Sequence, residues 1–479
     1  MSEKKQSVFS NMIWRFAERC GAQGVSFVVS VVLARILDPD AYGTIALITV
    51  FTTILQVFVD SGLGNALIQK KNADDLDFST VFFTNIIVCT VLYIGICMCA
   101  PLIALFYKRP ELTPYIRVLS FTVLISGIKN VQQAYVSRHM LFKRFFFSTL
   151  GGTVMAGIVG IIMALTGFGV WALVAQQVIN LAIDTIILWL TVKWRPQRQF
   201  SLDRLKGLFS YGWKLLASSL LDTAYNDLRQ LIIGKMYSAV DLAYYNQGEK
   251  LPKLVVSNIN ISIDSVLLPT MAKEQDNCEH VRNMTRRSIK TSVYIMAPVM
   301  IGLLLVAEPL VSLLLTDKWL PCVPFLRIFC ITFMFYPIHT ANLNAIKALG
   351  RSDLFLKLEI LKKVIGILLL LSTLWLGVIA MAYSLLVSSI CSQIINSWPN
   401  RKLLYYGYLE QLKDILPSIF LAIVMGGAIY PIRLIGLGNI ITLIVQVVLG
   451  GIIYIAGSIL FKIDSFQYLW TMLKQMIYR

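Results

Sequence analysis

Ionisable and amide side chains recur inside stretches of this sequence that are otherwise strongly apolar. In residues 9–36 and 242–272 they fall at spacings of three and four residues, which places them on one face of a helix. A group of lysines and arginines shielded from bulk water binds phosphate well, because arginine forks engage two oxygens and lysine adds point charge. We therefore expect a cavity that binds a phosphate-bearing anion, lined by Arg15, Arg19, Lys214, Arg229, Lys250, Lys253 and the amide of Asn260.

Carboxylates on the same faces indicate a second kind of chemistry. A carboxylate that faces a partly dry cavity can take up and release a proton as access to the cavity alternates. The candidates for such ion coupling are Asp60, Asp222, Asp227, Glu249 and Asp264. The alternative interpretation is structural: Arg15 and Arg19 would snorkel to the membrane interface, and Asp–Arg pairs would only hold helices together.

Composition identifies the elements that must position these groups. Of 479 residues, 57% are hydrophobic and only 14% charged, which excludes water-soluble domains and intrinsic disorder. Apolar runs of about 20 residues, the length needed to cross a bilayer, recur from end to end and predict about fourteen membrane-spanning helices. No C-x-x-C spacing occurs among the eight cysteines and the three histidines are far apart in sequence, so no metal or other cofactor is expected.

The net charge of +17 is unevenly distributed along the chain. One set of alternate connections, typified by residues 193–206, holds most of the lysines and arginines, whereas the other set holds few. The positive-inside rule then places both termini in the cytoplasm, which agrees with an even number of helices, and nucleic acid is not an expected partner. Because charges at Arg15, Glu18 and Arg19 interrupt the first apolar stretch, we interpret it as a retained helix and not a cleaved signal peptide.

An internal repeat has an offset of about 200 residues. Phe9, Ser10, Trp14, Arg15 and Arg35 are echoed by Phe209, Ser210, Trp213, Lys214 and Lys235. Copies separated by six helices share one orientation, which predicts a two-fold axis along the membrane normal and a substrate path between the halves. The expected divisions are a six-helix bundle at 1–206, a second at 207–400, and two further helices with an interfacial tail at 401–479.

Several short motifs resemble those of the polysaccharide transporter family. They are Leu33-Ala34-Arg35, Asp38-Pro39-Asp40-Ala41-Tyr42-Gly43, Asn226-Asp227, Ile232-Ile233-Gly234-Lys235, Tyr244-Tyr245-Asn246, Leu251-Pro252, Val266-Leu267-Leu268-Pro269-Thr270, Thr316-Asp317-Lys318-Trp319 and Ala348-Leu349-Gly350-Arg351-Ser352-Asp353. The resemblance covers essentially the whole chain and is closest to exporters of the lipopolysaccharide, colanic-acid and teichuronic-acid type. Ala239 and Ala243 depart from the proline and glycine often found in the second-half turn.

The resemblance implies a function as well as a fold. The family belongs to the superfamily of multidrug, oligosaccharidyl-lipid and polysaccharide exporters, which implies two six-helix bundles plus two helices. The implied activity is translocation of a polyprenyl-diphosphate-linked oligosaccharide across the bacterial cytoplasmic membrane, without ATP hydrolysis, with polymerase or export machinery as a further partner. Two alternatives stay open: a cation-coupled small-molecule exporter of the same fold, and a membrane-embedded glycosyltransferase or ligase, although no nucleotide-binding or nucleophile motif is evident.

Overall fold

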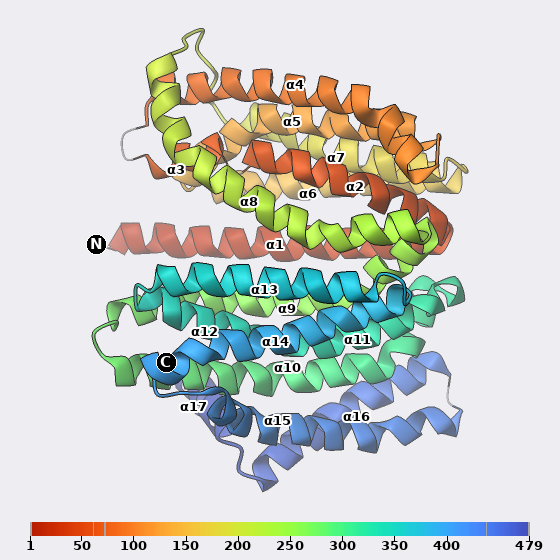
Figure 1. Ribbon diagram of the computed structural model, residues 1–479, viewed down its shortest axis with the longest axis vertical. Helices are drawn as coiled ribbons and strands as arrows, with labels where there is room; N and C mark the ends of the chain where they lie inside the picture. The colour runs from red at the N-terminus through yellow and green to blue at the C-terminus, as the bar shows by residue number, and fades with distance from the viewer. Residues whose placement is uncertain (1, 61, 71–72, 437, 478–479) are drawn as a thin grey trace. The chain divides into compact units, whose positions relative to one another are not determined.

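The computed structural model describes residues 2–60, 62–70, 73–436 and 438–477 (Figure 1). Among residues 2–19 the only side chain described is that of Trp14, and the side chains of 211, 262, 266, 473, 476 and 477 are also left out. Every regular element in the described ranges is a helix, which confirms the predicted all-α class. The chain forms two compact units, Met1–Ala243 (unit 1) and Tyr244–Arg479 (unit 2).

Unit 1 is built from eight helices and the start of a ninth. They are α1 (Ser2–Ile36), α2 (Pro39–Asp60), α3 (Leu63–Gln69), α4 (Asp75–Tyr107), α5 (Leu112–Arg138), α6 (Phe142–Leu165), α7 (Val170–Thr191), α8 (Leu202–Met236) and the first residues of α9 (Ala239–Lys273). Helix α6 packs on α1 and α7, and α5 packs on α2, α4 and α7. Helix α8 packs on α2, α3 and α4, which is why it belongs to this unit.

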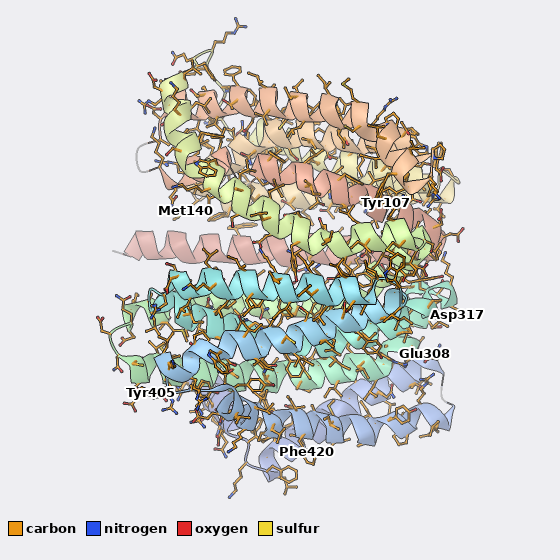
Figure 2. The ribbon with its side chains drawn as sticks, viewed as in Figure 1. Tyr107, Met140, Glu308, Asp317, Tyr405 and Phe420 are labelled. Atoms are coloured by element: carbon orange, nitrogen blue, oxygen red, sulfur yellow. The ribbon has the colours of Figure 1, made fainter. Side chains whose placement is uncertain are left out.

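Unit 2 contains the remainder of α9 and the rest of the chain. Its elements are α10 (Cys278–Leu315), η1 (Asp317–Cys322), α11 (Val323–Met334), α12 (Tyr336–Ala348), α13 (Ser352–Thr373), α14 (Val378–Leu403), α15 (Tyr408–Ile429), η2 (Tyr430–Ile435), α16 (Asn439–Leu460) and α17 (Asp464–Ile477). Helices α15 and α16 pack together and against α10 (Figure 1). Glu308 and Asp317 lie at one end of the unit and Tyr405 at the other (Figure 2).

Ten helical segments of the described chain are long and apolar enough to cross a membrane. Helices α1, α5, α8 and α13 do not meet that criterion over a full span; in α1 only Cys20–Ile36 is sufficiently apolar. Each of the four carries several charged residues, such as Lys129 in α5 and Lys214 in α8. The number fourteen therefore remains a prediction, and the four helices it adds include α1 and α8, two of the helices with the predicted cavity charges.

Helix α16 shows the physical pattern of a lipid-facing element. Its buried positions recur every four residues and are small or polar: Thr442, Gln446, Gly450, Tyr454 and Ser458. Its exposed positions are isoleucine, valine and leucine, for example Ile444, Val447 and Ile455. Because lipid is as apolar as leucine, helices in a membrane associate through close packing and hydrogen bonds instead of hydrophobic burial. The Nε2 of Gln446 accordingly donates to the Ile429 carbonyl at 3.1 Å.

Glycines allow helices of unit 1 to approach closely. A Cβ at Gly157 of α6 would lie 2.5 Å from a methyl of Val29 in α1. A Cβ at Gly43, in the second turn of α2, would lie 1.8 Å from the Ala239 carbonyl oxygen, where α9 begins. Only hydrogen fits in that space, so the glycine at position 43 is required by the contact between these backbones.

The polar connection between α7 and α8 is fixed to α4. The backbone N–H of Gln197 donates to Ser79 Oγ at 2.9 Å, and the backbone N–H of Ser201 donates to Thr80 Oγ1 at 3.2 Å. Ser201 then caps α8 by accepting from the Arg204 amide. The fully buried Asp77 receives Lys70 Nζ at 2.7 Å and lies 3.5 Å from Arg204. Hydrogen bonds from this connection and the ion pairs of Asp77 therefore tie the start of α8 to the start of α4.

The predicted repeat and domain limits can be compared with the observed elements. Helices α1 and α8 each contain 35 residues, beginning at Ser2 and Leu202, and the following helices begin at Pro39 and Ala239. These bounds match the predicted offset of 200 residues. The compact units, however, divide at 243/244 and not at 206/207, because α8 packs within unit 1. The division into bundles at 1–206 and 207–400, and their two-fold relation, remain predictions.

Candidate functional site

Helix α8 carries four of the predicted site residues in unit 1. Arg229 and Asp227 are half-buried, whereas Lys214 and Asp222 are exposed. The sequence places Asp222 and Arg229 seven residues apart, two turns of one helix, so they share a face. Helix α8 thus carries two bases and two acids between Lys214 and Arg229, and their assignment to a binding site remains a prediction.

Helix α9 carries the corresponding residues of unit 2. Lys253 Nζ lies 3.0 Å from Glu249 Oε1 one turn earlier, and the side chain of Lys253 is 61% exposed. Lys250 and Asp264 are also exposed, whereas Asn260 is half-buried. The Asn260 Oδ1 is a buried oxygen without a hydrogen-bond partner among the described residues. A buried acceptor of this kind is costly and is a position where a donor from water or a ligand would be stabilised.

The two remaining predicted bases, Arg15 and Arg19, belong to α1, but their side chains lie outside the described residues. Their assignment to a cavity is therefore still a prediction. The same holds for the assembly of all the predicted bases into one site, because they are divided between the two units.

Asp60, the predicted coupling residue of unit 1, is the last residue of α2. Both of its carboxylate oxygens lie 3.2 Å from Gln56 Nε2, one turn earlier. From α5, Lys129 attracts the carboxylate electrostatically. The neighbouring Asn130 accepts from Asn85 Nδ2 of α4 at 3.3 Å. Asp60 is therefore hydrogen-bonded within α2 and attracted by a base of α5.

The Lys129 side chain also forms an ion pair with a second acid. Its Nζ lies 2.5 Å from Asp184 Oδ2 on α7, and the two side chains are only 11% and 8% exposed. Charges so far from water are maintained only when they are paired and hydrogen-bonded. Lys129 thus lies between two carboxylates, Asp184 in direct contact and Asp60 at longer range.

The sequence predicted only one member of this cluster, Asp60. Lys129 and Asp184 are not among the predicted site residues. The available signal was simple: each is an ionisable residue inside an apolar stretch, and such residues need a partner. What the sequence could not supply was the pairing, because 55 residues, including the whole of α6, separate them.

Comparison with known proteins gives a family and a set of distant relatives. The family model described as "Polysaccharide biosynthesis protein" matches residues 32–324, more than half of the chain. The teichuronic acid biosynthesis protein TuaB of Bacillus subtilis (strain 168) is 28% identical over 63% of this chain, and the chain spans only 63% of that protein's length. The lipopolysaccharide biosynthesis protein WzxC of Escherichia coli (strain K12) is 24% identical over 83% of this chain and 79% of its own.

Among solved structures, the chain is similar to the lipid II flippase MurJ in an inward closed conformation. The TM-score is 0.76 at 16% sequence identity, over 95% of this chain and 99% of that one. At this identity the likeness shows the fold alone. It supports the all-helical membrane fold expected from the sequence, and it leaves the activity and substrate to be argued from the chemistry of the chain.

Proposed function

The chain belongs to the polysaccharide biosynthesis protein family, and we propose that it translocates a polyprenyl-diphosphate-linked oligosaccharide across the bacterial cytoplasmic membrane. The relatives named for teichuronic acid and lipopolysaccharide biosynthesis support a role in making a surface polysaccharide. The fold shared with a lipid II flippase supports transport of a lipid-linked sugar.

The observation that carries this proposal is the exposure of basic side chains on a spanning helix. Helix α9 is apolar enough to cross the membrane, yet Lys250 and Lys253 project from it into exposed positions. Lysine cannot face hydrocarbon without a large penalty, so Lys250 and the Lys253–Glu249 pair favour a water-filled chamber. In such a chamber the lysines can bind a diphosphate, and the sugars it carries would occupy the aqueous space.

The proposal has finer parts that follow from the sequence pattern. Fourteen helices would form two bundles plus two helices, with both termini in the cytoplasm. The diphosphate would be held by bases from the predicted set, and the polyprenyl tail would stay in lipid while access to the headgroup alternates. Asp60, which Lys129 attracts electrostatically, would supply the ion coupling of unit 1, because a carboxylate that faces a partly dry cavity can take up and release a proton.

The two rival functions predict different chemistry. An exporter of cationic drugs would favour an acidic or aromatic chamber, whereas the predicted chamber of this chain contains six bases, namely Arg15, Arg19, Lys214, Arg229, Lys250 and Lys253. A glycosyltransferase or ligase would leave an incomplete sugar chain on the lipid when it is removed. Both are therefore distinguishable by analysis of the lipid-linked sugars.

The test uses bacteria that lack the gene and are complemented with wild-type chain or with K250Q/K253Q. Polyprenyl-diphosphate glycolipids are identified by mass spectrometry, and their sidedness is read by oxidation with membrane-impermeant periodate. We expect the deletion to accumulate a completed oligosaccharide-lipid facing the cytoplasm, the wild-type chain to clear it, and the double variant to clear it at least tenfold more slowly.

The matched control is Lys402→Gln, which removes an exposed lysine in the last turn of α14. It should clear the lipid like wild type at equal membrane abundance. An unchanged lipid pool with normal surface polysaccharide in the deletion would refute the proposal in favour of a small-molecule exporter. Accumulation of a truncated sugar would refute it in favour of an enzyme.

A further inference from the structure

A polar pocket of about 490 Å³ lies in unit 2 between the first half of α10 and the helix α17. From α10 it is lined by Asn283, Arg286, Arg287, Lys290 and Thr291. The last four of these residues follow Asn283 by three, four, seven and eight positions, so all five lie on one face of the helix. Helix α17 contributes Asp464, Ser465 and Tyr468.

Each of the three bases of the pocket is held by a neighbouring side chain, and two of the three form ion pairs with an acid. Arg286 forms a two-point ion pair with Asp414 of α15, with Nε to Oδ2 at 2.6 Å and Nη2 to Oδ1 at 2.7 Å. Lys290 Nζ lies 2.6 Å from Asp464 Oδ2. The guanidinium of Arg287 lies over the Tyr468 ring, 4.5 Å from its centroid. Stacking holds this planar group in place while leaving its N–H groups able to donate.

The position of α17 places the pocket at a membrane surface. Helix α16 is apolar enough to span the membrane and ends at Leu460, and α17 begins after only three intervening residues. Helix α17 is amphipathic: Trp470 and Met472 are exposed, and Lys474 lies 5.6 Å from the Trp470 ring centroid. Such a helix lies in the interface with its apolar side toward the acyl chains.

We infer that this pocket binds the phosphate-bearing headgroup of an anionic phospholipid of the surrounding bilayer. Three bases and the hydroxyl or amide groups of Ser465, Thr291 and Asn283 offer donors to phosphate oxygens. Basic pockets between helices at a membrane surface take headgroups of this kind. A lipid fits better than a soluble anion, because α17, which lines the pocket, also exposes the apolar Trp470 and Met472 and directly follows a helix that is apolar enough to span the membrane. The lipid would hold α17 against α10 and so stabilise unit 2.

The experiment uses the purified, delipidated full chain in detergent. Cardiolipin, phosphatidylglycerol, phosphatidylcholine and inorganic phosphate are titrated separately, and binding is measured by native mass spectrometry and by the thermal unfolding midpoint. We expect cardiolipin and phosphatidylglycerol to bind at least tenfold more tightly than phosphatidylcholine and to raise the midpoint by several degrees. R287Q/K290Q should lose at least tenfold in affinity for both anionic lipids.

Two further variants keep the result interpretable. Lys474→Gln removes a base from α17 that does not line the pocket, and it should bind anionic lipid like wild type. If the double variant does not fold, the exposed Arg287 can be changed alone to Gln, with an expected loss of at least threefold. Equal binding of phosphatidylcholine, or unchanged binding by the Arg287 variants, would overturn the inference. Inorganic phosphate binding as tightly as the lipids would assign the pocket to a soluble anion and overturn it as well.

Discussion

Replacing Lys129 with methionine tests whether the buried ion pair of unit 1 behaves as its surroundings require. At the observed separation of 2.5 Å between Lys129 Nζ and Asp184 Oδ2, the attraction is about 7 kcal/mol for an effective dielectric constant of about 20. Desolvation of both ions offsets most of this energy, so the pair itself stabilises the fold much less.

Removing only one partner is a larger perturbation than removing both. In K129M the Asp184 carboxylate stays buried without its lysine and Asp60 loses an attractive charge, so we expect a loss of about 3–5 kcal/mol in unfolding free energy. In D184N the lysine keeps its attraction to Asp60, and a smaller loss of about 1–3 kcal/mol is expected. The double variant K129M/D184N, which leaves no ion from the pair, should be more stable than K129M alone.

The assay is unfolding of the purified chain by SDS titration in mixed micelles, followed by far-ultraviolet circular dichroism. Lys402→Met, at an exposed position of α14, controls for the loss of a lysine. The reasoning is refuted if the losses of the two single variants simply add in the double variant, because additivity means that the side chains do not interact.

Two further predictions concern backbone packing and a helix cap. Gly43→Ala places a methyl group against the start of α9 and should lower the free energy of unfolding by about 3 kcal/mol. Gly24→Ala in α1, where the added methyl group meets open space, should be neutral or slightly stabilising. Equal thermal unfolding midpoints for the two variants would contradict this prediction. The amide of Asp77 donates to the carboxylate of Asp74 at the start of α4 and lowers the pKa of Asp74. The resulting stabilisation of the folded chain is complete above the usual pKa of about 3.9 and is lost as pH falls through the lowered value. The difference in thermal unfolding midpoint between wild type and Asp74→Asn should therefore shrink below about pH 4, and a constant difference would contradict the prediction.

The sequence was informative where one local pattern determines the outcome. Hydropathy predicted an all-helical membrane protein, and the echo of residues near 15 and 214 predicted an offset of about 200 residues, which separates the first residues of α1 and α8. The tail expected at the end of 401–479 contains the helix α17. In each case the cause is local: apolar length, periodicity, or the composition of one helix.

Features that depend on packing between distant segments could not be predicted. Nothing local distinguishes Asp184, which pairs with α5, from an acid that only interrupts an apolar helix. Similarly, nothing local distinguishes Arg286, Arg287 and Lys290 from other basic residues near the end of a membrane-spanning helix. Their common face with Tyr468 depends on how α17 folds back onto α10, and hydropathy carries no information about that contact.

Helix α16 buries small and polar side chains and exposes hydrophobic ones, and this arrangement determines which substitutions the helix tolerates during evolution. Lipid is a fluid and has no fixed shape to match, so isoleucine, valine and leucine should exchange freely at outward positions such as Ile444 and Val447. The inward face, where Gly450 and Tyr454 meet neighbouring helices, must preserve volume and hydrogen bonding. In α16 the polar and small residues should therefore drift slowly and the hydrophobic ones quickly, the reverse of the order expected in a water-soluble protein.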